Sequence, residues 1–254
     1  MAQPLDASRA TVPMAGRCDD VAMSSSYEHI VSRGAHGVTI NNVYERLVEA
    51  DREIWFGSDG SGLIKTTQIW WSFFTDEQRT RWETTDHPPA TESLKPVFDP
   101  FGPGGLSPKG PRLAKLRTDP AKLAADLKVT RELTLFGIAG LMGEALVPEQ
   151  PRRALYEVAA GLPGAEVLEI STDELGRAGY GIARVEEMLL NRPGWRIELT
   201  FDRDSCELLG YRHVLLHDEP AFAPAGALVG WTSYLRREIV DALPAEAPAP
   251  VPRQ

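Results

Sequence analysis

The stretch NVYERLVEADREIWFGSDGSGLIKTTQIWWSFF, residues 42–74, decides the fold class. It contains two runs rich in β-branched and aromatic residues, 42–56 and 62–74, on either side of the glycine-rich segment GSDGSG. Runs of this composition around a short glycine-rich segment are typical of two strands joined by a turn. With the preceding run YEHIVSR (27–33) and the turn signal SRGAHG, they predict an antiparallel meander.

A second group of strand-like segments begins at residue 165. Its members are AEVLEIST, GYGIARV, MLLN, GWRIELTFD, CELLGYRHVLL and LVGWTSYL. The linking segments DELGRAG, NRPG and RDSC are short enough for hairpins. Both groups together give about ten antiparallel strands, and open sheets of that size usually close or split. We therefore expect a mainly β (α+β) fold, an antiparallel barrel or half-barrel with a central block of helices.

The central helices are indicated by three segments. TDPAKLAADL begins with Asp119 before Pro120, a pairing that starts helices. LTLFGIAGLMGEALVP is apolar, and PRRALYEVAAGLPG repeats apolar residues at helical spacing before Gly161. A further short surface helix is expected in TDEQRTRWETT (75–85), where Thr75 is a candidate N-cap.

The sequence predicts one domain with two loose ends. Residues 1–24 lack apolar periodicity and predict a flexible N-terminal arm, and the Pro- and Ala-rich residues 244–254 predict a disordered tail. Residues 25–243 form the barrel-like domain, with the helical insertion at about 118–163. Prolines crowd the segment 86–120, which we expect to be a long loop and a candidate lid.

Composition limits the classes of partner. The chain has 254 residues, a formal net charge of -9 and a pI near 5.1, which argue against nucleic acid and anionic membranes as partners. It has no apolar run of the roughly 18 to 20 residues that a membrane span needs and no secretion-signal pattern, so a cytoplasmic location is expected. Cys18 and Cys206 form no disulfide framework, and neither they nor the histidines show metal-ligand spacing.

The strand 42–56 has one acidic face. Because side chains alternate across a strand, this face carries Glu45, Leu47, Glu49, Asp51, Glu53 and Trp55. One interpretation is a solvated face on which Trp55 covers a neighbour. The other is that the end of the strand enters a cavity, where Trp55 forms an apolar wall that raises the pKa of Glu53 toward a value useful for proton transfer.

Glu198 presents a similar choice in the strand GWRIELTFD. The alternating row Trp195, Ile197, Leu199 and Phe201 is apolar, so Glu198 faces water or a polar lumen. A cross-strand ion pair with Arg184 or Arg212 is the structural alternative to a catalytic role. His29 shares a strand face with Tyr27 and is a candidate acid or base near neutral pH.

Aromatic side chains gather in IWWSFF (69–74). Two aromatics fall on each side of this strand, so one pair, including Trp70 or Trp71, can line a pocket while the other packs in the core. Common catalytic signatures are missing from the sequence: a phosphate-binding loop, a Rossmann fingerprint, a Gly-x-Ser-x-Gly elbow and a His-Glu-x-x-His motif. An apolar ligand site with a few acids remains.

Several blocks of the chain resemble, in order, an actinobacterial group of uncharacterised domains, many of which are membrane-tethered. The blocks are REIWFGSDGSG, FGPGGL, LRTDPAKL, ALYEVAAGLPG, LGRAGYGIAR, ELTFDRDSCELLGYRHVLL, GWTSYL and VDAL, within about residues 27–243. This chain differs by lacking the tether, by having Ser205 and Cys206 where a Thr-Gly hairpin tip is typical, and by pairing Trp70 with Trp71. The size and plan are also similar to the spiroacetal (spiroketal) cyclases of actinobacterial polyketide pathways.

The resemblance to these cyclases implies a cofactor-independent enzyme that closes a hydroxy ketone into a spiroacetal by general acid/base catalysis in a barrel cavity. On this hypothesis the catalytic residues are Glu53, Glu198 and His29. The substrate-binding residues are Trp55, Trp70, Trp71, Tyr27 and Arg212. No metal or other cofactor is expected, the partner is a hydrophobic small molecule, and the oligomeric state stays open. The alternative is a non-catalytic carrier or sensor of a lipid or hydrophobic metabolite.

Overall fold

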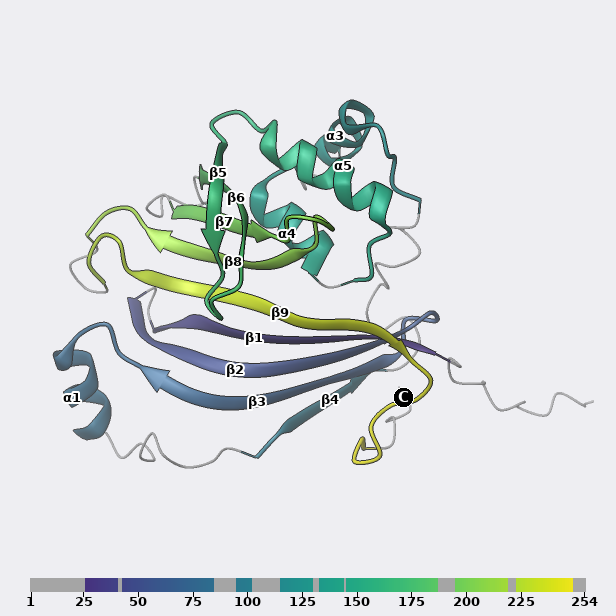
Figure 1. Cartoon of the computed structure of the whole chain (residues 1–254). Coiled ribbons are helices and arrows are strands. Elements are labelled where there is room, and N and C mark those ends of the chain that lie inside the picture. Colours follow the sequence, from purple (N-terminus) through teal and green to yellow (C-terminus); the bar gives the residue numbers. More distant parts are fainter. Residues whose placement is uncertain are drawn as a thin grey trace, which may run out of the picture.

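A single antiparallel sheet of nine strands dominates the computed structural model (Figure 1). The structure describes residues 26–40, 43–84, 95–101, 115–129, 133–143, 145–186, 195–218 and 223–248. The strand order is β4-β3-β2-β1-β9-β8-β7-β6-β5, so β4 and β5 are edges and the sheet is not closed. The mainly β prediction is confirmed in its half-barrel form.

Every neighbouring pair of strands is antiparallel. The strands are β1 (Tyr27–Ile40), β2 (Val43–Gly57), β3 (Gly62–Ser72), β4 (Val97–Phe101), β5 (Glu166–Thr172), β6 (Ala178–Glu186), β7 (Trp195–Phe201), β8 (Leu208–Leu215) and β9 (Leu228–Val240). The predicted strand at 188–191 lies outside the described residues. The predicted meander corresponds to β1, β2 and β3, but the predicted turn SRGAHG (32–37) is wrong, because these residues lie within β1 and pair with β2.

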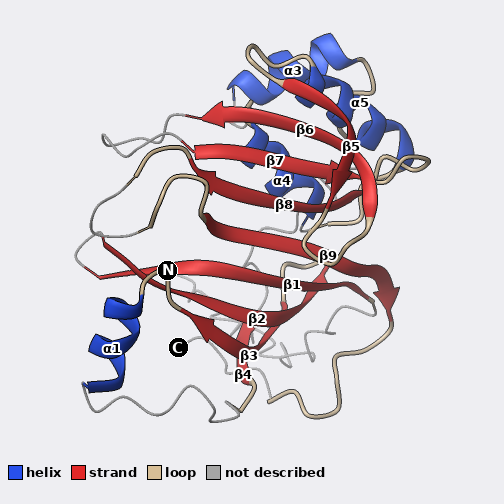
Figure 2. Cartoon of the chain, turned by 60° about the vertical axis from the view of Figure 1, so that its left-hand side comes forward, coloured by secondary structure: helices blue, strands red, loops and turns tan. Residues whose placement is uncertain are grey.

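The helices among the described residues are α1 (Asp76–Thr84), α3 (Pro120–Val129), α4 (Leu135–Gly143) and α5 (Glu149–Ala160). Figures 1 and 2 show α3, α4 and α5 together on one side of the β5–β9 half of the sheet, with α1 apart from them near β3. The predicted N-caps are present, because Asp119 Oδ1 accepts from Lys122 N at 2.9 Å and Thr75 Oγ1 accepts from Gln78 N at 3.2 Å. The central helical block is therefore confirmed.

The turn between β2 and β3 follows from its residues. Gly60 has φ +80°, which glycine adopts without steric cost, and Gly57 N donates to Ser61 O at 2.8 Å. Asp59 Oδ1 accepts from the backbone N of Ser61 at 2.9 Å, as an Asx turn does.

An edge strand lies in the segment that the sequence predicts to be a long loop. β4 pairs with β3, and Pro100 stands opposite Leu63. Proline is tolerated there because an edge strand leaves one row of N–H groups unpaired. Residues 86–94 and 102–114 of the candidate lid lie outside the described residues.

The two faces of the sheet differ in what they contact. We call the face that packs against α4 and α5 the inner face and the opposite one the outer face. The main core joins the inner face to the helices through fully buried residues such as Ile30, Ile182, Leu199, Phe201 and Leu155. Burying each such side chain contributes about 1.5–3 kcal/mol.

The helix α4 is attached to the sheet at both ends. At its N-terminus the carboxylate of Glu186 in β6 accepts from Leu135 N at 2.6 Å, and Thr134 Oγ1 accepts from Gly137 N at 2.9 Å. A carboxylate is stabilised there by the helix dipole. At its C-terminus Gly143 lies against the Tyr234 hydroxyl.

Both predicted loose ends lie partly or wholly outside the described residues. Residues 1–25 are not described, nor are 249–254. Residues 241–248 are described, and Leu243 and Ala247 pack against a small second core of Tyr27, Trp55 and Leu63. In the described residues, no helix has both the length and the apolar character needed to cross a membrane.

Candidate functional site

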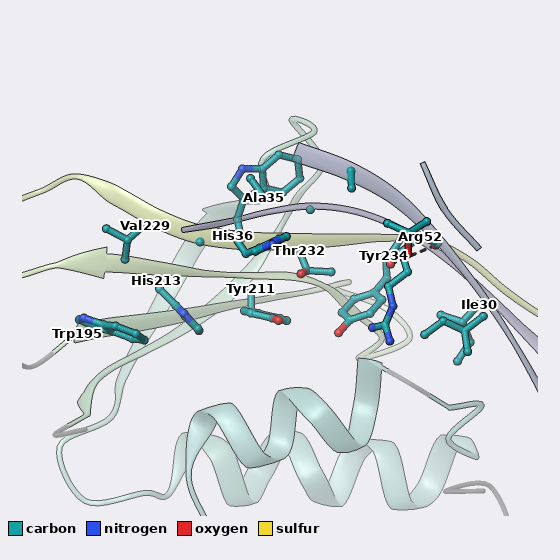
Figure 3. Close-up of a pocket in the computed structure, with 17 residues that line it drawn as sticks. Ile30, Ala35, His36, Arg52, Trp195, Tyr211, His213, Val229, Thr232 and Tyr234 are labelled. Atoms are coloured by element: carbon teal, nitrogen blue, oxygen red, sulfur yellow. Dashed lines mark hydrogen bonds between the residues drawn. The ribbon is translucent and has the colours of Figure 1, made fainter. Parts of the chain in front are cut away.

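A pocket of about 560 Å³ lies on the inner face, between the sheet and the helices (Figure 3). Its walls come from six strands, β1, β2, β3, β7, β8 and β9. Ile30, Ile54 and Val229 supply apolar surface, while Gly34, Ala35, Ala50 and Gly230 leave room. A cavity of this size fits a small organic molecule.

Four rings form a continuous row along the pocket, which we call the aromatic row: Trp195, His213, Tyr211 and Tyr234. Trp195 stacks on His213 with centroids 5.3 Å apart and planes 27° apart. Centroid distances of 5.4 Å from His213 to Tyr211 and 6.4 Å from Tyr211 to Tyr234 continue the row. Strand alternation explains the row, since Tyr211 and His213 stand two residues apart in β8 and therefore share a face.

His213 has a buried nitrogen at this wall. Burial lowers the pKa of its imidazole to about 4, so the ring is neutral at pH 7. Its Nε2 atom has no hydrogen-bond partner among the described residues. A buried polar atom without a partner costs about 1–3 kcal/mol, and a bound molecule with a polar group can remove this cost.

The opposite end of the pocket carries a cation. Arg52 lines it from β2, between Ser32 of β1 and Thr66 of β3 in the register, and Figure 3 shows its side chain beside Tyr234. Among the described residues that line the pocket, none is Asp or Glu. The pocket therefore has an aromatic wall and, at the far end from Trp195, a guanidinium group.

Tyr234 is fixed from two sides. The guanidinium of Arg237 lies 4.4 Å from its ring centroid and donates to Leu208 O at 2.9 Å. Burial lowers the pKa of Arg237, and a buried cation over a π face is a stabilising arrangement. On the other side, Gly143 of α4 lies so close to the Tyr234 hydroxyl that any side chain at position 143 would overlap it. Tyr234 is thus a rigid part of the wall.

Phe136 projects from α4 over the aromatic row. Its ring stands edge-on to Tyr211, with centroids 6.3 Å apart and planes 88° apart, and lies 5.7 Å from His213. The side chain is nevertheless 55% exposed. An exposed apolar ring against partly buried ones places Phe136 between the helix and solvent at this end of the row.

The residues predicted to be catalytic lie on the outer face, not in this pocket. The structure does bring His29 and Glu53 together, with His29 Nε2 3.2 Å from Glu53 Oε2, and His29 Nδ1 is 3.3 Å from Glu238 Oε1. Lys65 Nζ also lies 3.2 Å from Glu53 Oε1. Trp55 stacks on His29 at 4.5 Å and is buried with Tyr27.

These contacts correct the predicted arrangement of Glu53. Trp55 was expected to form a wall against the carboxyl inside a cavity, whereas its ring covers His29. The alternation of β2 explains the difference, because placing Trp55 in the second core turns Glu53 to the outer face and Arg52 and Ile54 to the pocket.

Glu198 is also on the outer face, and it is a partner in ion pairs. Glu198 is 8% exposed, and its carboxylate lies 2.6 Å from Arg212 Nη2 and 2.7 Å from Arg196 Nε. Burial acts to raise its pKa, but the hydrogen bonds and charges of Arg196 and Arg212 outweigh it and hold the pKa below its usual value. The predicted alternative of an ion pair with Arg212 is confirmed, while Arg184 contacts Glu186 instead.

Two further predicted binding residues, Trp70 and Trp71, belong to β3. The side chains of Trp70 and Trp71 lie outside the described part of β3. Within the described residues, no group of three or more His, Cys, Asp or Glu side chains is arranged to hold a metal ion.

Sequence reasoning missed the residues that line the pocket. His213 and Tyr211 were visible as alternate residues in CELLGYRHVLL, and Arg52 was in the mixed row opposite Glu53. The signal that could have found them is the apolar end of that row, Ile54 and Phe56, which marks the face turned to the core. No known family model matches the chain, and a comparison with curated protein sequences gives no match.

Proposed function

We propose that this protein is a carrier or sensor that binds a hydrophobic, ring-containing small molecule in the inner-face pocket. The observation that carries the proposal is the aromatic row, which turns four rings toward a cavity of about 560 Å³. Flat apolar molecules stack on such rings, and each aromatic contact adds about 0.5–1.5 kcal/mol beyond the burial of area.

The polar groups of the pocket support binding rather than proton transfer between carboxylates. The acids Glu53 and Glu198 both lie on the outer face and contact basic side chains. Inside the pocket, His213 supplies one buried nitrogen available to a ligand. A small number of polar groups placed in an otherwise apolar wall is typical of sites that orient a bound ligand.

The test is a titration with N-phenyl-1-naphthylamine, a neutral dye whose fluorescence rises in apolar surroundings. We expect saturable binding with one site per chain. Ala50→Phe places a ring into the pocket and should weaken binding at least tenfold, whereas Thr67→Phe, on the outer face of β3, should leave it within twofold. Absence of saturable dye binding, or equal loss in both variants, contradicts the proposal.

A second candidate function is the cofactor-independent cyclisation of a hydroxy ketone to a spiroacetal. The observation that favours it is the neutral imidazole of His213 next to the phenol of Tyr211, since an imidazole and a phenol can accept and donate protons. In that case Glu53→Gln should leave turnover of a keto-diol unchanged, and His213→Phe should lower it by roughly 100-fold or more. The reverse result would return the reaction to the outer-face cluster of His29 and Glu53.

A further inference from the structure

Long side chains on β8 stand beside short ones on β9 inside the pocket. In the register, His213 lies opposite Gly230 and Tyr211 lies opposite Thr232, and all four residues line the pocket. Paired residues of antiparallel strands share a face, so the two rings of β8 stand next to a low floor on β9. Figure 3 shows His213, Tyr211 and Thr232 together on the sheet side of the pocket. A flat molecule on this floor would have one edge against the rings of β8.

Gly230 leaves space beside the imidazole of His213. A Cβ atom built at Gly230 would lie 3.7 Å from His213 Nδ1 and 3.5 Å from Ala35 O, which are ordinary contact distances. A clash therefore does not require glycine at this position, and the backbone of Gly230 is not in the left-handed region either. What the missing side chain does provide is room for an atom of a ligand beside Nδ1.

The polar groups around this space are neutral and have no protein partner. Among the described residues, no hydrogen bond joins His213 Nδ1, the Tyr211 hydroxyl or the Thr232 hydroxyl to another residue. The imidazole is neutral at pH 7, because burial lowers its pKa to about 4. A neutral imidazole nitrogen donates or accepts according to the tautomer, and a hydroxyl group can do both.

We propose that the pocket binds a phenol: a flat aromatic molecule whose rings lie on the floor of β9 against the aromatic row, and whose hydroxyl group occupies the space beside Gly230 and hydrogen-bonds to His213 Nδ1. This inference rests on the proposed binding function and adds the class of ligand. A phenolic hydroxyl matches Nδ1 in either tautomer, since it can donate or accept. The stacking of Trp195 on the imidazole holds His213 in place for this contact.

Two matched naphthalenes at pH 7 test the inference by displacement of bound N-phenyl-1-naphthylamine. 2-Naphthol and 2-methylnaphthalene have nearly the same shape and are uncharged at this pH, but only the first can form a hydrogen bond. The methyl compound is the more apolar, so burial of area alone would make it the better ligand. We expect 2-naphthol to bind about fivefold tighter, the fold-change that corresponds to one neutral hydrogen bond.

Two variants assign this preference to the space beside Nδ1. His213→Phe keeps a ring in the aromatic row and removes the nitrogen. Gly230→Ala keeps the imidazole and fills the space with a methyl group at ordinary contact distances. Each variant should reduce the preference for 2-naphthol to less than about twofold, since the hydrogen bond is lost. The two naphthalenes are compared within each variant, so a general change in pocket size affects both of them.

The matched controls make the same chemical changes elsewhere. His217→Phe replaces an exposed histidine that does not line the pocket. Gly140→Ala adds a methyl group to a glycine of α4 with no atom within 4 Å of the new Cβ. The preference for 2-naphthol should persist in both controls. Its loss in them would overturn the inference, because the effect would then be independent of the space beside Nδ1.

The failure of the inference is distinguishable from that of the binding function. If wild-type protein binds the dye but prefers 2-naphthol less than about twofold, the inference is overturned, whether or not any variant folds. A full preference that persists in either His213→Phe or Gly230→Ala also overturns it, since the hydroxyl would then lie elsewhere. If the dye itself does not bind, the proposed function fails first.

Discussion

The imidazole of His213 stacks on the indole of Trp195, with ring centroids 5.3 Å apart, across the neighbouring strands β8 and β7. The imidazole lies at the wall of the pocket, and burial lowers its pKa to about 4, so the ring is neutral at pH 7. The same burial that orients His213 toward a ligand therefore makes the protein sensitive to acid.

The first prediction concerns pH. The pKa of His213 is about 4 in the folded protein, below the usual 6.5, so the unfolded chain binds this proton first as the pH falls. The free energy of unfolding should thus decrease between pH 6.5 and about 4 and level off below. One pKa unit corresponds to about 1.4 kcal/mol, which gives a loss of about 3 kcal/mol.

Urea unfolding of wild type and His213→Phe at pH 7 and pH 4.5 measures this effect. The variant should lose about 2 kcal/mol less than wild type over this range. His217→Gln removes an exposed histidine and should behave as wild type. Parallel pH profiles for wild type and His213→Phe would contradict the lowered pKa.

The second prediction compares two glycines of α4. Gly143→Ala should lower stability by about 1–3 kcal/mol and weaken dye binding, because the added Cβ overlaps the Tyr234 hydroxyl. Gly140→Ala meets no atom within 4 Å and should raise stability by up to about 1 kcal/mol, as alanine favours helix. Thermal unfolding with the dye titration distinguishes them, and equal behaviour of the two variants would refute the contact.

The third prediction concerns the outer-face ion pairs of Glu198. Glu198→Gln should destabilise the fold by about 2–4 kcal/mol, because Arg196 and Arg212 lose their shared partner. Glu166 also contacts Arg196 but is 61% exposed, so Glu166→Gln should cost less than about 1 kcal/mol. Dye affinity should stay constant in both. A stable Glu198→Gln protein with altered ligand binding would instead favour a direct role in the site.

The fourth prediction concerns the β7–β8 hairpin. Cys206 has φ +56°, the left-handed region, which costs a residue with a Cβ about 1–2 kcal/mol. Cys206→Gly should therefore raise the midpoint of chemical unfolding, by an equivalent of about 0.5–1 kcal/mol. Asp204→Gly, in the same turn without positive φ, should lower it slightly. A loss of stability in Cys206→Gly would show that its side-chain contacts outweigh the backbone strain.

The strands and central helices were predictable because they depend on local patterns. Three of these patterns are the alternation in 42–56 and 62–74, the turn at Gly60 and the N-cap at Asp119. Each depends only on residues that are close together in the sequence. The pairing of Glu198 with Arg212 was also accessible, since strands joined by a short hairpin are neighbours. Such features need no knowledge of the distant chain.

The location of the site could not be read in this way. Alternation shows that Glu53 and Arg52 lie on opposite faces of β2, but not which face the helices cover. That choice depends on the pairing of β1 with β9. These strands are about 200 residues apart, and their pairing joins the β1–β4 half of the sheet to the half that packs against the helices.

The sequence by itself determined the elements and their faces, because side-chain periodicity is a local property of the backbone. Only the tertiary structure decided that His213, Tyr211, Trp195, Tyr234 and Arg52 share one cavity and that His29 and Glu53 share another surface. The physical reason is burial: the helices cover the face whose apolar residues gain most from leaving water, and the pocket lies on that same face, beside small residues of β1 and β9.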